Sequence, residues 1–126
     1  LEYWANRFYK EGFATDADYM LAYQKTRESL ANLIGCESGE VSFFLNTSGG
    51  INQVAFHLGL KENDEVLMWD QEYPSHLYPW QQACVLTGAK LKIVQSDEKT
   101  MATPTARFIE NLNSKTRVVA FSWMQY

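Results

Sequence analysis

Apolar residues in segment 48–60 recur at intervals of three and four. This spacing places them on one face of a helix: Ile51, Val54, Ala55 and Leu58. The segment before it, residues 40–45, is short and mostly apolar at its end, which predicts a strand. The pattern therefore predicts a strand that runs directly into an amphipathic helix.

The same reading extends along the chain. It predicts further helices over residues 16–34, 76–86 and 104–112, and further strands over 65–70, 91–94 and 117–122. Gly35 and Gly88 are expected to end helices, and Pro79 is expected near the first turn of its helix. Residues 1–13 are aromatic and without clear periodicity, so an irregular segment is expected there.

Strands that alternate with helices predict an α/β fold with a mostly parallel sheet covered on both faces, a three-layer α/β/α sandwich. No repeat, linker or low-complexity stretch interrupts residues 1–126, so one domain is expected.

Composition narrows the function classes. The chain has 126 residues, 46% of them hydrophobic and 14% aromatic, which argues against disorder. The net charge is −4 and no basic run occurs, so nucleic-acid binding is not expected. No apolar run approaches the roughly 18 residues of a membrane span. Cys36 and Cys84 lack metal-ligand spacing and are expected to be buried thiols in a reducing cytoplasm.

The turn between the first strand and its helix reads Asn46-Thr47-Ser48-Gly49-Gly50. A helix N-terminus presents unpaired N–H groups and a positive dipole end, which suit an anion. Thr47 and Ser48 add hydroxyl groups, although the same residues are also common helix caps. The turn is neither a Walker A loop nor a dinucleotide Gly-x-Gly-x-x-Gly motif.

A second block follows the strand 65–70 and contains Glu72-Tyr73-Pro74 and Pro79-Trp80-Gln81. With the Thr47-Ser48 turn and the stretch 59–67, it resembles the class V family of fold-type I enzymes that depend on pyridoxal phosphate. The likeness runs from about Arg27 to Tyr126.

The resemblance implies roles for individual residues. Thr47 and Ser48 correspond to the pair that holds the cofactor phosphate, and Tyr73 to the aromatic residue that stacks on the pyridine ring. Tyr126 corresponds to a position near the cofactor or substrate. Gly49 and Gly50 depart from the acidic or hydroxyl residues often found there, which leaves the finer phosphate contacts open.

Several other polar and aromatic residues are expected to be structural. His57 and His76 are read as structural or surface histidines, and Asp70 and Glu72 as local hydrogen-bond partners. Two tryptophans are expected in the core: Trp80 and Trp123.

The resemblance further implies an enzyme of several hundred residues that acts on an amino acid, as a homodimer. The Schiff-base lysine is not expected in this chain, because no lysine here has the family's context. No catalytic or metal-binding residue is therefore predicted, and the chain is expected to be part of the large, cofactor-binding domain.

An aminotransferase is the first expectation for the reaction. Cysteine desulfurases usually carry His where Tyr73 stands, and a tyrosine is a poorer acid–base group at neutral pH. Epimerase-like, kynureninase-like and desulfurase-like enzymes remain alternatives, as does a non-catalytic phosphate-binding α/β module.

Overall fold

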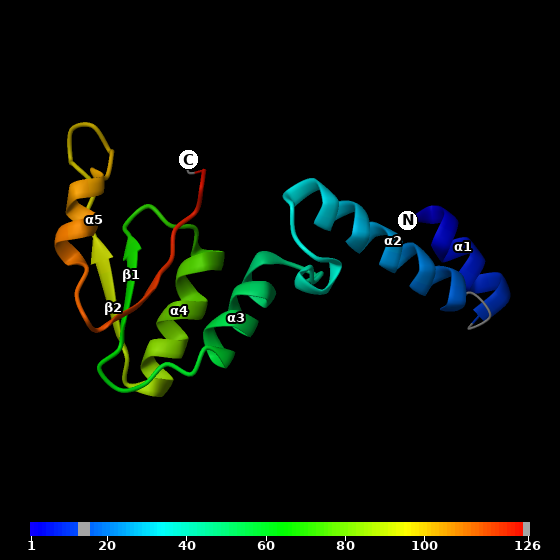
Figure 1. Cartoon of the computed structure of the whole chain (residues 1–126), viewed down its shortest axis with the longest axis horizontal. Coiled ribbons are helices and arrows are strands. Elements are labelled where there is room, and N and C mark those ends of the chain that lie inside the picture. The colour runs from blue at the N-terminus through cyan, green and yellow to red at the C-terminus, as the bar shows by residue number, and fades with distance from the viewer. Residues whose placement is uncertain (13–15, 125–126) are drawn as a thin grey trace. The chain divides into compact units, whose positions relative to one another are not determined.

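The structure, a computed structural model, describes residues 1–12 and 16–124 (Figure 1). The chain divides into two compact units, residues 1–43 and residues 44–126, and each is described by itself.

The first unit consists of helices α1 (Glu2–Glu11) and α2 (Asp16–Ile34) and a short 3₁₀ helix, η2 (Ser38–Glu40). The expectation of an irregular start was wrong, because residues 2–11 form a helix. Arg7 accounts for part of its stability: its guanidinium lies 3.0 Å from Glu11, four residues on, and 2.9 Å from Asp18 of α2. An arginine–glutamate pair four residues apart favours a helix.

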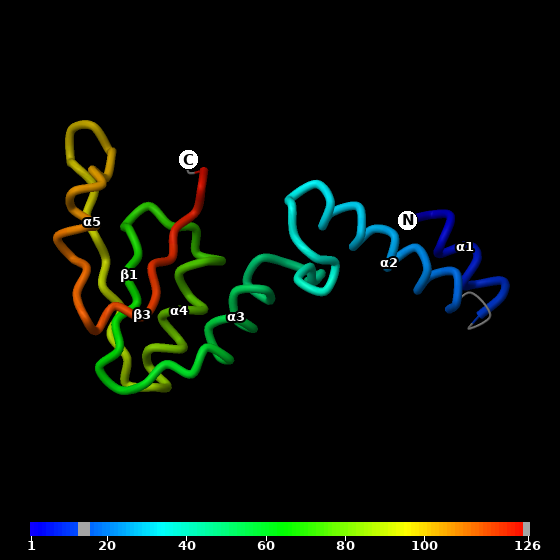
Figure 2. The backbone as a smooth tube through the Cα atoms, in the orientation of Figure 1, coloured from blue at the N-terminus to red at the C-terminus, as the bar shows by residue number. Residues whose placement is uncertain are grey.

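The second unit is an α/β structure. Its helices are α3 (Thr47–His57), α4 (Pro74–Thr87) and α5 (Thr105–Asn111), and its strands are β1 (Glu65–Trp69), β2 (Lys90–Val94) and β3 (Thr116–Val119). The strands form a parallel sheet in the order β2-β1-β3, with β1 in the centre. The backbone trace in Figure 2 can be followed from β1 through α4 to β2, and then back through α5 to β3.

Side chains alternate between the two faces of β1. Val66 and Met68 are buried in one cluster with Trp80 and Ala83 of α4. Trp69 points to the other face, where its ring meets that of Phe108 of α5 at 5.9 Å between centroids. Helices therefore cover both faces, and the predicted three-layer arrangement with a parallel sheet is confirmed (Figure 1).

The predicted strand 40–45 is not formed. Residues 41–44 follow η2 without regular structure, and Phe44 and Leu45 are exposed. A strand needs a neighbour to take up its backbone N–H and C=O groups. Among the described residues none pairs with this segment, so its apolar sequence alone does not make it a strand.

Both glycine stops are confirmed. Gly35 directly follows α2 with φ of 75°, and Gly88 caps α4 in the left-handed conformation with φ of 75°. Pro79 departs from expectation: α4 begins at Pro74, so Pro79 lies inside the helix and not in its first turn. Because Pro79 has no N–H, the carbonyl of Ser75, four residues earlier, lacks its usual hydrogen bond within the helix.

Candidate functional site

The candidate site lies where β1 and β3 end. The chain leaves β1 through α4 towards β2 on one side, while β3 lies on the other side of β1. In open α/β sheets, ligands bind beyond the carboxyl ends of the strands at such a change of direction. The segments that follow β1 and β3, with the start of α3, form this edge.

A hollow of about 410 Å³ opens at this edge. Its lining comes from the N-terminal turns of α3 and α4 and from the segment after β3: Thr47, Ile51, Tyr73, Ser75, His76 and Ser122. We call it the edge pocket. It brings together two residues predicted for the cofactor, Thr47 and Tyr73.

Asn46, and not Thr47 or Ser48, caps α3. Its side-chain Oδ1 accepts a hydrogen bond of 2.8 Å from the N–H of Gly49. Thr47 and Ser48 then occupy the first turn, and no acceptor is found for their N–H groups in the part of the chain that the structure describes. Sequence reasoning missed this role of Asn46, although Asn is a preferred cap residue.

The hydroxyl group of Ser48 makes a hydrogen bond between two helices. It donates to the carbonyl oxygen of Ser75 at 3.2 Å, the carbonyl that Pro79 leaves without a helical donor. The bond ties the first turn of α3 to the first turn of α4. The Ser48 hydroxyl proton is therefore already used, whereas Thr47 lines the edge pocket.

Tyr73 caps α4 through its backbone: its carbonyl accepts from the N–H groups of His76 and Leu77, both at 2.9 Å. Pro74 fixes the first helical residue, so the ring of Tyr73 is held at the pocket wall. Tyr126, the fourth predicted cofactor residue, lies outside the described residues.

Glu72 is the most completely bonded side chain of the site. Oε1 accepts from Trp69 Nε1 and from the N–H of Ser122, each at 2.5 Å. Oε2 accepts from Ser122 Oγ at 2.7 Å and lies 2.9 Å from His76 Nδ1. Its side chain is fully buried. One carboxylate thus joins the end of β1, the first turn of α4 and the segment after β3.

Burial by itself would raise the pKa of the Glu72 carboxyl, but hydrogen bonds from the hydroxyl and N–H of Ser122 and from His76 outweigh it and lower the pKa. The group is therefore held as a carboxylate. The sequence marked it only as a hydrogen-bond partner, which is confirmed, but gave no sign that it is buried.

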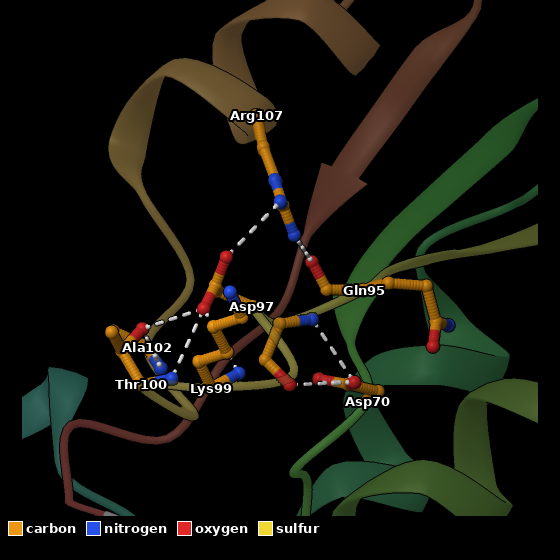
Figure 3. A network of polar contacts seen from close by, with 8 residues as sticks. Asp70, Gln95, Asp97, Lys99, Thr100, Ala102 and Arg107 are labelled. Carbon is orange, nitrogen blue, oxygen red and sulfur yellow. Dashed lines mark hydrogen bonds and ion pairs between the residues drawn. The ribbon is translucent and has the colours of Figure 1, made fainter.

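Asp70 also bonds as expected. It accepts from the N–H and the hydroxyl of Ser96, at 3.0 and 2.8 Å, and so ties the end of β1 to the loop after β2. Figure 3 shows that loop, with Arg107 reaching from α5 to the carbonyl of Gln95 and to Asp97. Hydrogen bonds from Thr100 and Lys99 lower the pKa of the Asp97 carboxyl. This network orders a neighbouring loop, and none of its members lines the edge pocket.

The remaining residues named from the sequence differ in their burial. Trp80 and Cys84 are buried, and burial raises the pKa of the Cys84 thiol. Cys36 is only half-buried.

Trp123, expected in the core, is 93% exposed, so that expectation was wrong. It follows β3, where none of the described residues packs over it. His57 is the last residue of α3, and its Nδ1 lies 2.8 Å from the carbonyl of Gln53.

Two classes of site are not found among the described residues. Within 1–12 and 16–124 there is no group of three or more His, Cys, Asp or Glu side chains placed to hold a metal ion. In the same ranges no helix combines the length and the apolarity that crossing a membrane would require.

The chain belongs to the aminotransferase class-V family, whose sequence model matches residues 2–125. A probable cysteine desulfurase from Synechocystis sp. is 36% identical over 102 residues. The match covers 78% of this chain but 24% of that relative, so the chain spans about a quarter of the relative's length.

Solved structures agree with this assignment. The apo structure of a cysteine desulfurase from Thermococcus onnurineus has a TM-score of 0.71 and 29% identity, over 79% of this chain and 25% of that one. The cystine C–S lyase C-DES in complex with cysteine persulfide has a TM-score of 0.85 at 20% identity, over 97% of this chain and 33% of that one. The second likeness shows the fold alone.

Proposed function

We propose that this chain is part of the cofactor-binding domain of a pyridoxal-phosphate-dependent enzyme that acts on an amino acid. The observation that supports this most directly is the edge pocket. It places the N-terminus of α3, with Thr47, beside the ring of Tyr73. One end of the pocket suits an anion and the other a flat aromatic ring.

The residues present fit pyridoxal phosphate. The N–H groups of Thr47 and Ser48 and the hydroxyl of Thr47 would hold the phosphate, while Tyr73 would cover one face of the pyridine ring. When bound, the cofactor supplies an electron sink for the bonds of the amino acid at its α-carbon. Tyr126 is proposed as a further contact, on the family resemblance only.

Two reaction types have support. The family name and the tyrosine at position 73 favour an aminotransferase. Two curated relatives are named a probable cysteine desulfurase and a cysteine desulfurase, which favours the release of sulfur from cysteine as the second candidate. Assays of the full-length protein with L-cysteine, for sulfide and alanine, and with other amino acids and a keto acid, for transamination, separate the two.

We further propose a cytoplasmic homodimer. The resemblance to class V enzymes supports the homodimer, and the free thiols of Cys36 and Cys84 support a reducing cytoplasm. Sedimentation of the full-length protein and fractionation of cells test them, and a monomer or a membrane-bound protein would contradict them.

Cofactor binding tests the phosphate site. In the full-length protein, Thr47→Val should weaken pyridoxal phosphate by about 1.5–3 kcal/mol, the range for losing a hydrogen bond to a charged group. Ser48→Ala should weaken it less, because the Ser48 hydroxyl is bonded to Ser75 and only its N–H remains for the phosphate. Equilibrium dialysis gives the dissociation constants.

Inorganic phosphate serves as the control ligand. If Thr47→Val binds pyridoxal phosphate as tightly as the wild type, the hydroxyl of Thr47 does not hold the phosphate and the proposed contact is wrong. Binding of inorganic phosphate without binding of the cofactor would instead favour the non-catalytic phosphate-binding module.

A further inference from the structure

The contact between Glu72 and His76 fixes which nitrogen of the imidazole ring carries the hydrogen. The carboxylate of Glu72 is saturated: each oxygen meets two donors. An ionised carboxylate only accepts hydrogen bonds, so the Nδ1 of His76 must carry a hydrogen. The tautomer of a neutral His76 is thereby fixed, and Nε2 is left as an acceptor.

His76 also borders the edge pocket. Its side chain is 12% exposed and lines the pocket with Thr47, Tyr73 and Ser122. No partner for its Nε2 is found among the described residues. A histidine at a pocket wall whose second nitrogen is held by a buried carboxylate has the arrangement of an oriented general base.

We propose that His76 is a proton acceptor of the edge pocket, and that Glu72 is the positioning residue that fixes its ring. This rests on the proposed function, in which the ligand is an amino acid. Such a ligand arrives as an ammonium ion and must lose a proton before its nitrogen can act as a nucleophile. Nε2 of His76 takes that proton: an N–H bond of the ammonium breaks, the electron pair stays on the amine, and an Nε2–H bond forms.

The resulting imidazolium is stabilised by the Glu72 carboxylate and later returns its proton to water. Other titratable or charged groups border the same ring: Tyr73 at the start of α4 lines the edge pocket, and Arg117 of β3 lines a neighbouring hollow that also touches His76. The positive charge of Arg117 opposes the imidazolium, whereas the negative charge of the Glu72 carboxylate favours it.

The pH profile of the full-length holoenzyme tests the pair. Wild-type kcat/KM, measured with whichever of the twenty common L-amino acids reacts fastest, should rise with pH as His76 loses its proton. His76→Asn keeps an amide donor for Glu72. It should lower kcat/KM by about 10²- to 10⁴-fold and abolish the rise of kcat/KM with pH, the pH limb. Glu72→Gln removes the charge that favours the imidazolium, so the rise of kcat/KM should move to lower pH.

The second histidine of the chain provides a matched control. His57 also has its Nδ1 on an acceptor, the Gln53 carbonyl, but it is exposed on α3 and lines no described pocket at the sheet edge. His57→Asn should leave kcat/KM and its pH profile unchanged. Circular dichroism of each variant checks folding.

Nitrogen-15 NMR of histidine-labelled protein gives a readout independent of activity. The signals lost in His76→Asn identify this residue, and neutral His76 should be protonated at Nδ1 and not at Nε2. The opposite tautomer would overturn the inference, even if Glu72→Gln does not fold. So would an unchanged pH limb in His76→Asn enzyme that still binds pyridoxal phosphate, and the proposed function would then stand. A wild-type protein that binds no cofactor would instead refute the proposed function.

Discussion

At the scale of single residues, Glu72 links pH to stability. Its pKa is lowered in the folded protein, so the folded state holds the carboxylate down to lower pH than the unfolded chain does. Its stabilising contribution is therefore complete above the unfolded pKa of about 4.3 and is lost as the pH falls through the lowered value. Glu72→Gln should reduce the free energy of unfolding at pH 7 by roughly 2–4 kcal/mol.

Urea unfolding at pH 7, 5 and 3.5 measures this. The difference between wild type and Glu72→Gln should shrink towards pH 3.5. Glu110→Gln, at an exposed position of α5, is the control and should change little at any pH. A difference that is constant over the whole range would mean that the carboxylate charge is not what stabilises the site.

Tyr73 should act through its ring. In the full-length protein, Tyr73→Phe should keep most cofactor affinity and activity, because the stacking face is retained. Tyr73→Ala should lose on the order of 1 kcal/mol or more of cofactor affinity, the scale of an aromatic pair with its burial. Dissociation constants and turnover are the measurements. Loss of turnover in Tyr73→Phe at normal cofactor binding would make the hydroxyl an acid–base group and remove the argument against desulfurase chemistry.

At the scale of elements, the end of α4 depends on Gly88. Its φ is 75°, and an added Cβ would lie 3.2 Å from Cγ of Glu62. Gly88→Ala should therefore lower the free energy of unfolding by roughly 1–2 kcal/mol, the cost of the left-handed conformation for a residue with a side chain. Gly39→Ala, at a glycine with no atom within 4 Å of the added Cβ, should cost much less. Chemical denaturation of both variants gives the comparison, and equal losses would argue against the cap.

The elements also show where a local pattern is sufficient. The glycine stops, the strand 65–70 and most of the apolar face of α3 follow from neighbouring residues, and they were predicted correctly. Val54, expected on that face of α3, is 54% exposed. The strand 40–45 was not, because a strand depends on a partner distant in sequence. The helix predicted from residue 76 begins two residues earlier, at Pro74. Proline fits the first turn of a helix but does not contribute to the apolar spacing that predicts one.

At the scale of the whole molecule, the chain alone should not hold the cofactor covalently. The side chains that line the edge pocket include no lysine. Lys92, which is half-buried, is engaged by the carbonyl of Asn111 at 3.1 Å and by Glu65 at 3.2 Å. Borohydride reduction of the 126-residue chain with pyridoxal phosphate should label several lysines partially. Peptide mapping that finds one lysine labelled in full would show that this chain contains the Schiff-base residue.

The sequence by itself determined the order of elements from α3 to β3, the parallel α/β architecture and the resemblance to class V enzymes. These depend on apolar spacing, turn residues and short motifs, all of which are local. It also named Thr47 and Tyr73, through the resemblance of the turns that hold them to those of the class V family.

Only the tertiary structure decided which contacts the polar residues of the site make. Asn46 caps α3, and Pro79 leaves the carbonyl of Ser75 free to accept from the hydroxyl of Ser48. The buried carboxylate of Glu72 accepts from Ser122, fifty positions further along the chain. Each of these depends on where α4 and β3 return to the sheet edge. The hydrogen bond that a hydroxyl or carboxylate makes is set by groups distant in sequence, and no local pattern records them.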